Sequence, residues 1–181
     1  MTARRTGVGL ASDCSGGPVV DVLRSALAGV PLGCVEAVVP IPVRIAVYGS
    51  PGPQGSKRHV GGGRMIESSK KVRPWRQDVK GAAEAYRRHH GLPVLDGPLR
   101  VRMVFTLPKP AGAPKRRQTW PMRMPDLSKL VRSTEDALTD AGLWADDARV
   151  VECFSAKRYP GEGIDALDAP GCVIVVESIK A

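Results

Sequence analysis

The sequence predicts a single α+β domain in which one mixed β-sheet is covered by two main helices. Three observations lead to this expectation. The 181 residues are enough for one hydrophobic core and too few for two comfortable ones. Stretches with the two-residue alternation of strands are interspersed with stretches that have the apolar spacing of helices. These elements follow the order strand, hairpin, helix, strand, helix, strand, strand, and the chain contains no internal repeat.

The first 40 residues look separate from the rest: residues 11–20 are small and polar, residues 21–30 could form a short helix, and neither stretch has recognisable chemistry. We expect residues 1–40 to be an appended or poorly ordered N-terminal arm and residues 41–181 to form the domain. No stretch approaches the roughly 20 apolar residues of a membrane span, and no signal-peptide pattern is recognisable at the N-terminus. Four widely spaced cysteines, without a C-x-x-C pair, predict reduced thiols and no zinc site. We therefore expect a cytoplasmic protein.

In the first half of the domain, the sequence predicts a strand, a hairpin and a helix. Residues 41–50 alternate as a strand that Gly49 and Pro51 end. Three glycines separate "KRHV" from "RMIES", which predicts two short strands joined by a turn. Residues 72–90 carry apolar side chains at helical spacing, namely Trp75, Val79, Ala82, Ala83 and Tyr86. We assign Trp75 to core packing.

The second half predicts a strand, a second helix and two further strands. Residues 97–110 alternate as a strand, and a basic, proline-rich loop follows. Residues 127–141 have a buried helical stripe, with Asp126 placed to cap its start and Gly142 to end it. The last two strands are expected over 148–159 and 171–180.

The charge is divided unevenly along the chain. Residues 55–123 contain 17 Lys and Arg against 4 Asp and Glu, whereas residues 124–181 contain 6 against 11. A basic segment suits a polyanion such as nucleic acid, because each phosphate contact releases condensed counterions. Uneven but purely solubilising surface charge is the alternative, and it stays open at this point.

Two basic stretches supply candidate contacts to nucleic acid. "GSPGPQGSK" (49–57) contains the residue types of a phosphate loop, but its spacing is wrong and its prolines remove backbone donors. We reject it as a nucleotide site and keep its Lys57, with the adjacent Arg58, as contacts to a nucleic acid backbone. "KKVRPWRQD" (70–78) adds Arg73 and Arg76 at a helix start.

The stretch "MPDLSKLVRSTEDALTDAGLWADDARV" (124–150) gathers six acids. Asp126 precedes the predicted helix, and Asp146 and Asp147 follow it. Carboxylates without competing nitrogen or sulfur ligands suit Mg²⁺ or Mn²⁺. Such an ion can activate water and stabilise charge during phosphodiester cleavage. An equal alternative makes Asp126 a helix cap and the Asp146–Asp147 pair a solvated turn.

Geometry limits how these acids can meet. A helix over 127–141 extends roughly 21 Å at 1.5 Å per residue, and the residues from Gly142 to Asp147 reach at most about 17 Å. Asp147 can approach Asp126 of its own chain only if the chain reverses at Gly142 and runs back along the helix. Otherwise one carboxylate must come from a second subunit.

The stretch "PDLSKLVRSTEDALTDAGLWADDARVV" resembles the signature of RusA-type Holliday junction resolvases, which reads approximately D-L-D-N-L-x-K, then D-A-L-T, A-G and D-D-x-x-V. A weaker similarity extends over "GSPGPQGSKR", "WRQDV" and the closing strands, so the resemblance covers about residues 43–179. It implies a RusA-like fold and a homodimer that binds four-way DNA junctions. It also implies paired, Mg²⁺-dependent nicks in recombination and repair, in a bacterial or phage-infected cell.

The resemblance also implies roles for individual residues. Asp126 and Asp147 fall on the family's catalytic, metal-binding aspartates, with Asp146 beside the second. Ser128 occupies the position of the family's second aspartate, and Arg132 occupies the position of its lysine. We therefore include both among the candidate site residues. Lys129 and Arg132 are expected at the scissile region, and Lys57, Arg58, Arg73 and Arg76 on the DNA arms.

Two other functions stay open. The first is a junction-binding protein with weak or no cleavage, because a serine hydroxyl at position 128 is a poorer metal ligand than a carboxylate. The second is an RNA-binding accessory module, which fits the charge but leaves the acids without a role.

Overall fold

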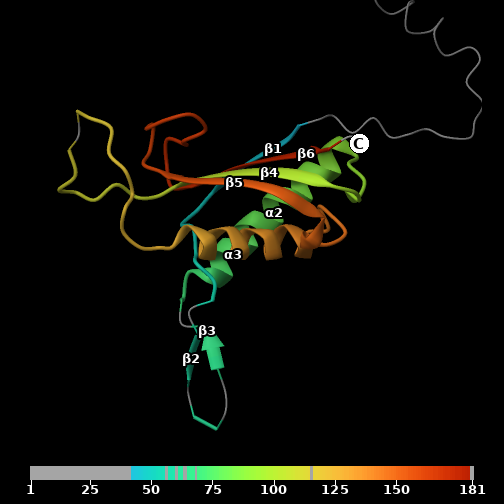
Figure 1. Cartoon of the computed structure of the whole chain (residues 1–181), viewed down its shortest axis with the longest axis horizontal. Helices are drawn as coiled ribbons and strands as arrows, with labels where there is room; N and C mark the ends of the chain where they lie inside the picture. The colour runs from blue at the N-terminus through green and yellow to red at the C-terminus, as the bar shows by residue number, and fades with distance from the viewer. Residues whose placement is uncertain are drawn as a thin grey trace, which may run out of the picture. The chain divides into compact units, whose positions relative to one another are not determined.

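The computed structural model describes residues 42–179 except 56, 60, 63, 64, 68 and 115, and the side chains of 57–59 and 65–67 are also outside the description. The predicted α+β class is confirmed, with one mixed sheet and two main helices (Figure 1). The strands are β1 (Val43–Tyr48), β2 (Lys57–His59), β3 (Met65–Glu67), β4 (Leu99–Thr106), β5 (Val150–Arg158) and β6 (Gly171–Ser178). The helices are α2 (Val72–His90), α3 (Leu127–Asp140) and the short 3₁₀ turn η1 (Asp147–Arg149).

The four-stranded sheet has the order β1-β6-β4-β5. The closing strand β6 is central, and it pairs antiparallel with both β1 and β4. Its six consecutive buried residues, Gly171–Val176, suit a strand that is paired on both sides in the middle of the sheet. β4 and β5 are parallel, so the chain between them, which includes α3, must cross from one end of the sheet to the other.

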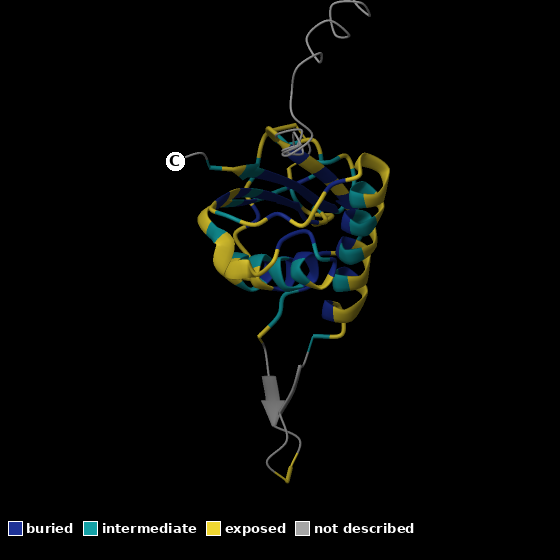
Figure 2. Cartoon of the chain, turned by 90° about the vertical axis from the view of Figure 1, so that its right-hand side faces the viewer, coloured by how far each residue is buried: buried dark blue, intermediate teal, exposed yellow. Residues whose placement is uncertain are grey.

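Both helices cover one face of this sheet (Figure 1). The core lies between helices and sheet, and its largest fully buried side chains include Trp75 of α2, Leu130 and Leu138 of α3, and Phe105 of β4. The burial of Trp75 confirms its predicted core role. The stripes of buried residues along α2 and α3 face the sheet, while their outer faces are exposed (Figure 2). No helix in the described part of the chain is long and apolar enough to cross a membrane.

A separate two-stranded hairpin, β2–β3, extends away from the sheet (Figure 1). In the chain, the hairpin lies between the loop that follows β1 and the start of α2. It was predicted from the two short strand-like runs around the glycines.

The predicted elements agree with the structure apart from their ends. α2 has the predicted bounds, and Gly142, with φ 63°, follows α3 as expected. The predicted strand over 148–159 begins two residues late, because Asp147–Arg149 form a 3₁₀ turn first. The predicted arm over 1–40, with Cys14 and Cys34, lies outside the described residues. Cys153 and Cys172 are free thiols.

Candidate functional site

Asp126 immediately precedes α3 and is exposed to solvent. It holds the N-cap position with an extended backbone, but its carboxylate accepts no hydrogen bond from the first turn. The carboxylate instead pairs with Lys129 Nζ at 3.1 Å, so the predicted side-chain cap is wrong. The preceding loop is fixed by Lys157 of β5, whose Nζ donates to the carbonyl oxygens of Arg123 (3.0 Å) and Pro125 (3.1 Å). Asp126 therefore stands on a fixed backbone and faces solvent.

Asp146 and Asp147 lie at the opposite end of α3, and they differ in what their carboxylates do. Asp146 accepts a 2.8 Å hydrogen bond from the backbone N–H of Ala148 and so caps the 3₁₀ turn. Asp147 is exposed and lies near Glu135. Burial, together with the charges of Asp147 and Asp136, raises the pKa of the Glu135 carboxyl. Asp147 is thus the freer of the two adjacent aspartates.

The length of α3 separates Asp126 from Asp147. Its 14 residues extend about 21 Å. The chain does reverse at Gly142, and β5 runs back beside α3 until Lys157 reaches the loop before Asp126. However, η1 comes before β5, so Asp147 stays at the far end of the helix. The structure holds these two aspartates at opposite ends of one helix.

The two main candidate ligands of a divalent ion, Asp126 and Asp147, are thus apart in the described chain. Mg²⁺ takes oxygen ligands at about 2.0–2.1 Å and is usually held by one or two carboxylates. Among the described residues, no three Asp, Glu, His or Cys side chains come together in a way that could hold a metal. The Ser128 hydroxyl lies two positions after Asp126, on the exposed first turn of α3.

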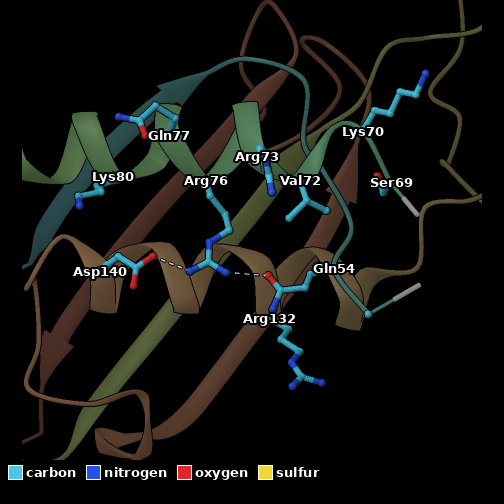
Figure 3. Close-up of a pocket in the computed structure, with 11 residues that line it drawn as sticks. Gln54, Ser69, Lys70, Val72, Arg73, Arg76, Gln77, Lys80, Arg132 and Asp140 are labelled. Atoms are coloured by element: carbon cyan, nitrogen blue, oxygen red, sulfur yellow. Dashed lines mark hydrogen bonds and ion pairs between the residues drawn. The ribbon is translucent and has the colours of Figure 1, made fainter. Parts of the chain in front are cut away.

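Basic side chains line an open groove between α2, α3 and the base of the hairpin (Figure 3). The groove has a volume of about 1070 Å³. Its charged lining residues are Lys70, Arg73, Arg76, Lys80, Arg132 and Asp140. Arg73 and Arg132 are both exposed, and neither makes an ion pair with a described residue. Their positive charges are available to an anionic ligand.

Arg76 is placed differently from the other groove cations, because it is already paired. Its Nη2 contacts Asp140 at 2.5 Å and its Nη1 contacts Asp136 at 3.3 Å. The same Nη1 donates to Gln54 Oε1 at 3.1 Å, and Gln54 Nε2 donates to Asp136 at 2.5 Å. This network, part of which is drawn in Figure 3, joins the loop after β1 to both helices. Arg76 thus neutralises Asp140, which lines the groove, and Asp136 beside it on α3.

A smaller recess of about 240 Å³ opens at Asp126. Lys71, Lys129 and Met124 are among its lining residues. Ser69 lines both this recess and the basic groove, so the two hollows adjoin. The recess that holds the exposed carboxylate of Asp126 therefore adjoins the basic groove.

The predicted site residues are therefore only partly brought together. Asp126, Ser128 and Lys129 lie at the recess end of α3, Arg73 and Arg132 in the groove, and Asp146 and Asp147 away from both. Lys57 and Arg58 fall on β2, but their side chains lie outside the described residues.

Sequence reasoning did not single out Lys157, Glu135 or Gln54. Their surroundings come from residues elsewhere in the chain: Lys157 contacts Pro125 over 32 positions, Gln54 contacts Asp136 over 82, and Glu135 lies near Asp147. A partial signal existed for Lys157, because the strand alternation puts it on the same face of β5 as Cys153 and Ser155.

A family model of the endodeoxyribonuclease RusA matches residues 49–165, which is more than half of the chain. The matched range contains α2, α3, the basic groove and all the candidate acidic residues. No curated protein gives a significant match. On this match, the chain belongs to the RusA family of endodeoxyribonucleases.

Proposed function

We propose that this protein is a Mg²⁺-dependent, structure-specific endodeoxyribonuclease that resolves Holliday junctions and other branched DNA by paired symmetric nicks. It would act as a homodimer during recombination and repair, in the cytoplasm of a bacterial or phage-infected cell. The observation that carries this proposal is the position of the Asp126 recess, which adjoins the basic groove through Ser69. A chain bound by its phosphates in the groove would pass close to a carboxylate.

In this proposal the groove binds the DNA backbone. Lys70, Arg73, Lys80 and Arg132 contribute positive charge that releases counterions when phosphates enter. Lys57 and Arg58 on the hairpin extend the contact to the DNA arms. Arg76 contributes indirectly, because without it the carboxylates of Asp136 and Asp140 would repel the backbone.

Lys129 and Arg132 are the proposed contacts of the scissile phosphate. Arg132 lies on the exposed side of α3, about one and a half turns after the Asp126 cap. Its planar guanidinium can hold two phosphate oxygens at once, which an ammonium group cannot do in the same geometry. Lys129 is placed to give up its ion pair with Asp126 when a phosphate or a metal ion binds there.

Asp126 and Asp147 are the proposed direct metal ligands, with Asp146 and Ser128 in supporting positions. Because α3 separates the two main ligands, each site would take Asp126 from one chain and Asp147 from another. When bound, Mg²⁺ supplies an activated water and stabilises the charge that develops on the phosphate.

Cleavage of a labelled four-way junction, with and without Mg²⁺, tests this function. Asp126→Asn should lower the nicking rate by about a hundredfold or more, the scale of single contacts that stabilise transition-state charge. Asp168→Asn, an exposed acid in the loop before β6, is the matched control and should cleave normally. Full activity of Asp126→Asn at saturating Mg²⁺ would contradict the assigned mechanism.

A mixture of Asp126→Asn and Asp147→Asn chains tests whether each site is shared. If it is, each mixed dimer regains one intact site, so a random mixture should recover about a quarter of the wild-type sites in a symmetric dimer. If each site lay within one chain, the mixture would recover nothing.

Ser128 supports a second candidate, a junction-binding protein that cleaves weakly or not at all. A neutral hydroxyl binds a hard cation less well than the carboxylate that the family has at this position. Junction binding without nicking in Mg²⁺ or Mn²⁺ would favour this candidate. Nicking by Ser128→Asp, with junction affinity unchanged, would then identify the missing ligand.

A further inference from the structure

The long loop between β4 and α3, residues 107–126, exposes three large apolar side chains (Figure 1). Trp120, Met122 and Met124 are 54%, 89% and 88% exposed. They lie in a basic surrounding, because residues 107–123 contain five Lys and Arg and no acid. Single exposed apolar residues occur on any protein surface, whereas several of them close together indicate a surface that binds something. The loop is therefore a candidate binding surface outside the basic groove.

Trp120 is supported on one face of its ring by Arg158, at the end of β5. The Arg158 Cζ atom lies 4.8 Å from the centroid of the indole, within the range of a cation–π contact. Gly163, with φ 120°, leaves room for this arginine, because a Cβ there would lie 3.1 Å from Arg158 Nε. More than half of Trp120 nevertheless remains exposed. The indole is thus held in place and is still accessible to a ligand.

The residue before Trp120 fixes the backbone of the loop. The Glu162 carboxylate accepts hydrogen bonds from the Thr119 N–H at 2.9 Å and from Thr119 Oγ1 at 3.3 Å, and it pairs with Lys109. The hydrogen bonds from Lys109 and from the Thr119 N–H lower the pKa of the Glu162 carboxyl, so this anchor is ionised at neutral pH. A ligand that binds Trp120 consequently meets a side chain whose backbone is already ordered, which lowers the entropy cost of binding.

The same loop leads directly to the Asp126 recess. Met124 lines that recess and also a neighbouring hollow of about 250 Å³, whose lining includes Pro121 and Arg123. The basic groove, the Asp126 recess and this hollow therefore adjoin one another, and the hollow is bordered by the residue that follows Trp120. Trp120 stands at the end of this series that is farther from the groove.

We propose that Trp120 stacks on an unpaired base of the DNA strand that passes Asp126, so that the protein prefers branched or partly unpaired DNA to continuous duplex. This inference rests on the proposed function for the identity of the ligand as DNA. The stacking site itself rests on Trp120 and on the loop that holds it. Arg116, Arg117 and Arg123 are exposed in the same loop and supply positive charge for the backbone of that strand.

Stacking on Trp120 selects DNA by structure and not by sequence. Every base has a flat π-face, so an indole accepts all four bases. In a continuous duplex both faces of a base are covered by its neighbours, and freeing one base costs unstacking and unpairing free energy. A base that is already unpaired at a branch point does not incur that cost. The indole therefore gains a contact on unpaired DNA that it cannot gain on an intact duplex.

The intrinsic fluorescence of the protein provides the first test. The chain has three tryptophans, and Trp75 and Trp144 are 0% and 1% exposed. The difference in emission between the wild type and Trp120→Phe therefore isolates the signal of Trp120. Oligothymidylate, added without Mg²⁺, should quench most of this signal. A signal that is unchanged when the oligonucleotide is bound would overturn the proposal. So would a signal that acrylamide does not quench in the free protein, because another part of the chain or a second copy would then cover the indole.

Fluorescence anisotropy with labelled DNA measures the preference directly. Trp120→Ala should weaken binding to oligothymidylate about tenfold or more, as loss of one base–aromatic stack does, and should leave the affinity for a duplex near the wild-type value. Trp120→Leu keeps apolar bulk without a flat ring, so it should lose the same affinity. Tyr48→Ala is the matched control, because Tyr48 is an aromatic residue of similar exposure (57%) on β1. Equal losses on both DNAs for Trp120→Ala, or full affinity for Trp120→Leu, would contradict stacking.

These measurements separate the stacking site from the catalytic proposal, because binding is measured without Mg²⁺. If Trp120→Ala loses the preference for unpaired DNA but the wild type nicks no junction in Mg²⁺, the stacking site stands and the catalytic function fails. If the wild type nicks a junction and Trp120→Ala keeps the preference, the function stands and the stacking site is wrong.

Discussion

Gly52 illustrates how a single residue positions the wall of the groove. A Cβ at this position would overlap the carbonyl oxygen of Lys71 and would approach the backbone nitrogen of Val72 at 2.9 Å. The carbonyl oxygen of Gly52 also accepts a 2.6 Å hydrogen bond from the buried Ser133 hydroxyl of α3. Only a residue without a side chain fits between the two helices here. Two positions later, the chain presents Gln54 to Arg76.

Glu135 makes stability depend on pH. Burial, with the neighbouring charges of Asp147 and Asp136, raises the pKa of its carboxyl. A raised folded-state pKa means that the contribution of Glu135 is fully present below the ordinary glutamate value of about 4.3 and is lost as pH rises through the folded value. At neutral pH the ionised Glu135 carboxylate therefore lowers the stability of the folded state.

Glu135→Gln should consequently raise the melting temperature at pH 7, and the gain should shrink toward zero as the pH falls below about 4.3. Thermal unfolding followed by circular dichroism at several pH values measures this. Glu84→Gln on α2 is the matched control, and the same pH-dependent difference in both variants would count against the assigned cause.

At the scale of elements, α2 and α3 are joined by a buried hydrogen bond as well as by apolar packing. Trp75 Nε1 donates to Thr134 Oγ1 at 3.0 Å, and both residues are 0% exposed. Thr134 in turn donates to the carbonyl oxygen of Leu130 at 2.9 Å. The indole N–H has no access to water, so it depends on Thr134 of the other helix for its hydrogen bond.

Thr134→Val keeps the shape of the side chain but removes the acceptor of the Trp75 N–H. We expect the free energy of unfolding to fall by about 1–3 kcal/mol, the cost of an unsatisfied buried donor. Thr139→Val is the comparison: Thr139 accepts from Trp144 Nε1 at 2.7 Å but is half-buried, so we expect a smaller loss than for the fully buried Thr134. Urea unfolding measures both, and an equal or larger loss for Thr139→Val would contradict this reasoning.

Sequence patterns were sufficient for the elements but not for their arrangement. Alternation and helical spacing predict α2 and β1 closely because those signals are local. The central position of β6 and the parallel β4–β5 pair depend on which strands meet, and no neighbouring residue encodes that. The same limit applies to the site. The acids around α3 are visible in the sequence, whereas the Gln54–Arg76–Asp136 network requires residues up to 82 positions apart to come together.

For the whole molecule, the basic groove predicts how DNA binding responds to salt. Arg73 is exposed in the groove and makes no ion pair with a described residue. If it contacts one phosphate, Arg73→Gln should reduce the slope of log affinity against log salt by about 0.9 on duplex arms. Fluorescence anisotropy with a labelled four-way junction over a salt series measures the slope.

Arg88→Gln is the matched control for this measurement. It removes the same charge from the same helix, but Arg88 lies in the last turn of α2 and does not line the groove. We expect its slope to stay close to the wild-type value. Equal slopes for the two variants would mean that only net charge, and not the groove, determines binding.

The parallel pairing of β4 and β5 limits where the chain can change in length. The 22 residues from Asp126 to Asp147 must carry the chain across the sheet once, on a helix that packs against the core. One residue inserted in α3 would rotate everything after it by about 100° and turn its buried stripe away from the sheet. The irregular segment between β4 and α3 has no such periodicity to preserve. Insertions and deletions in related chains should therefore accumulate before Asp126 and be rare between the two aspartates.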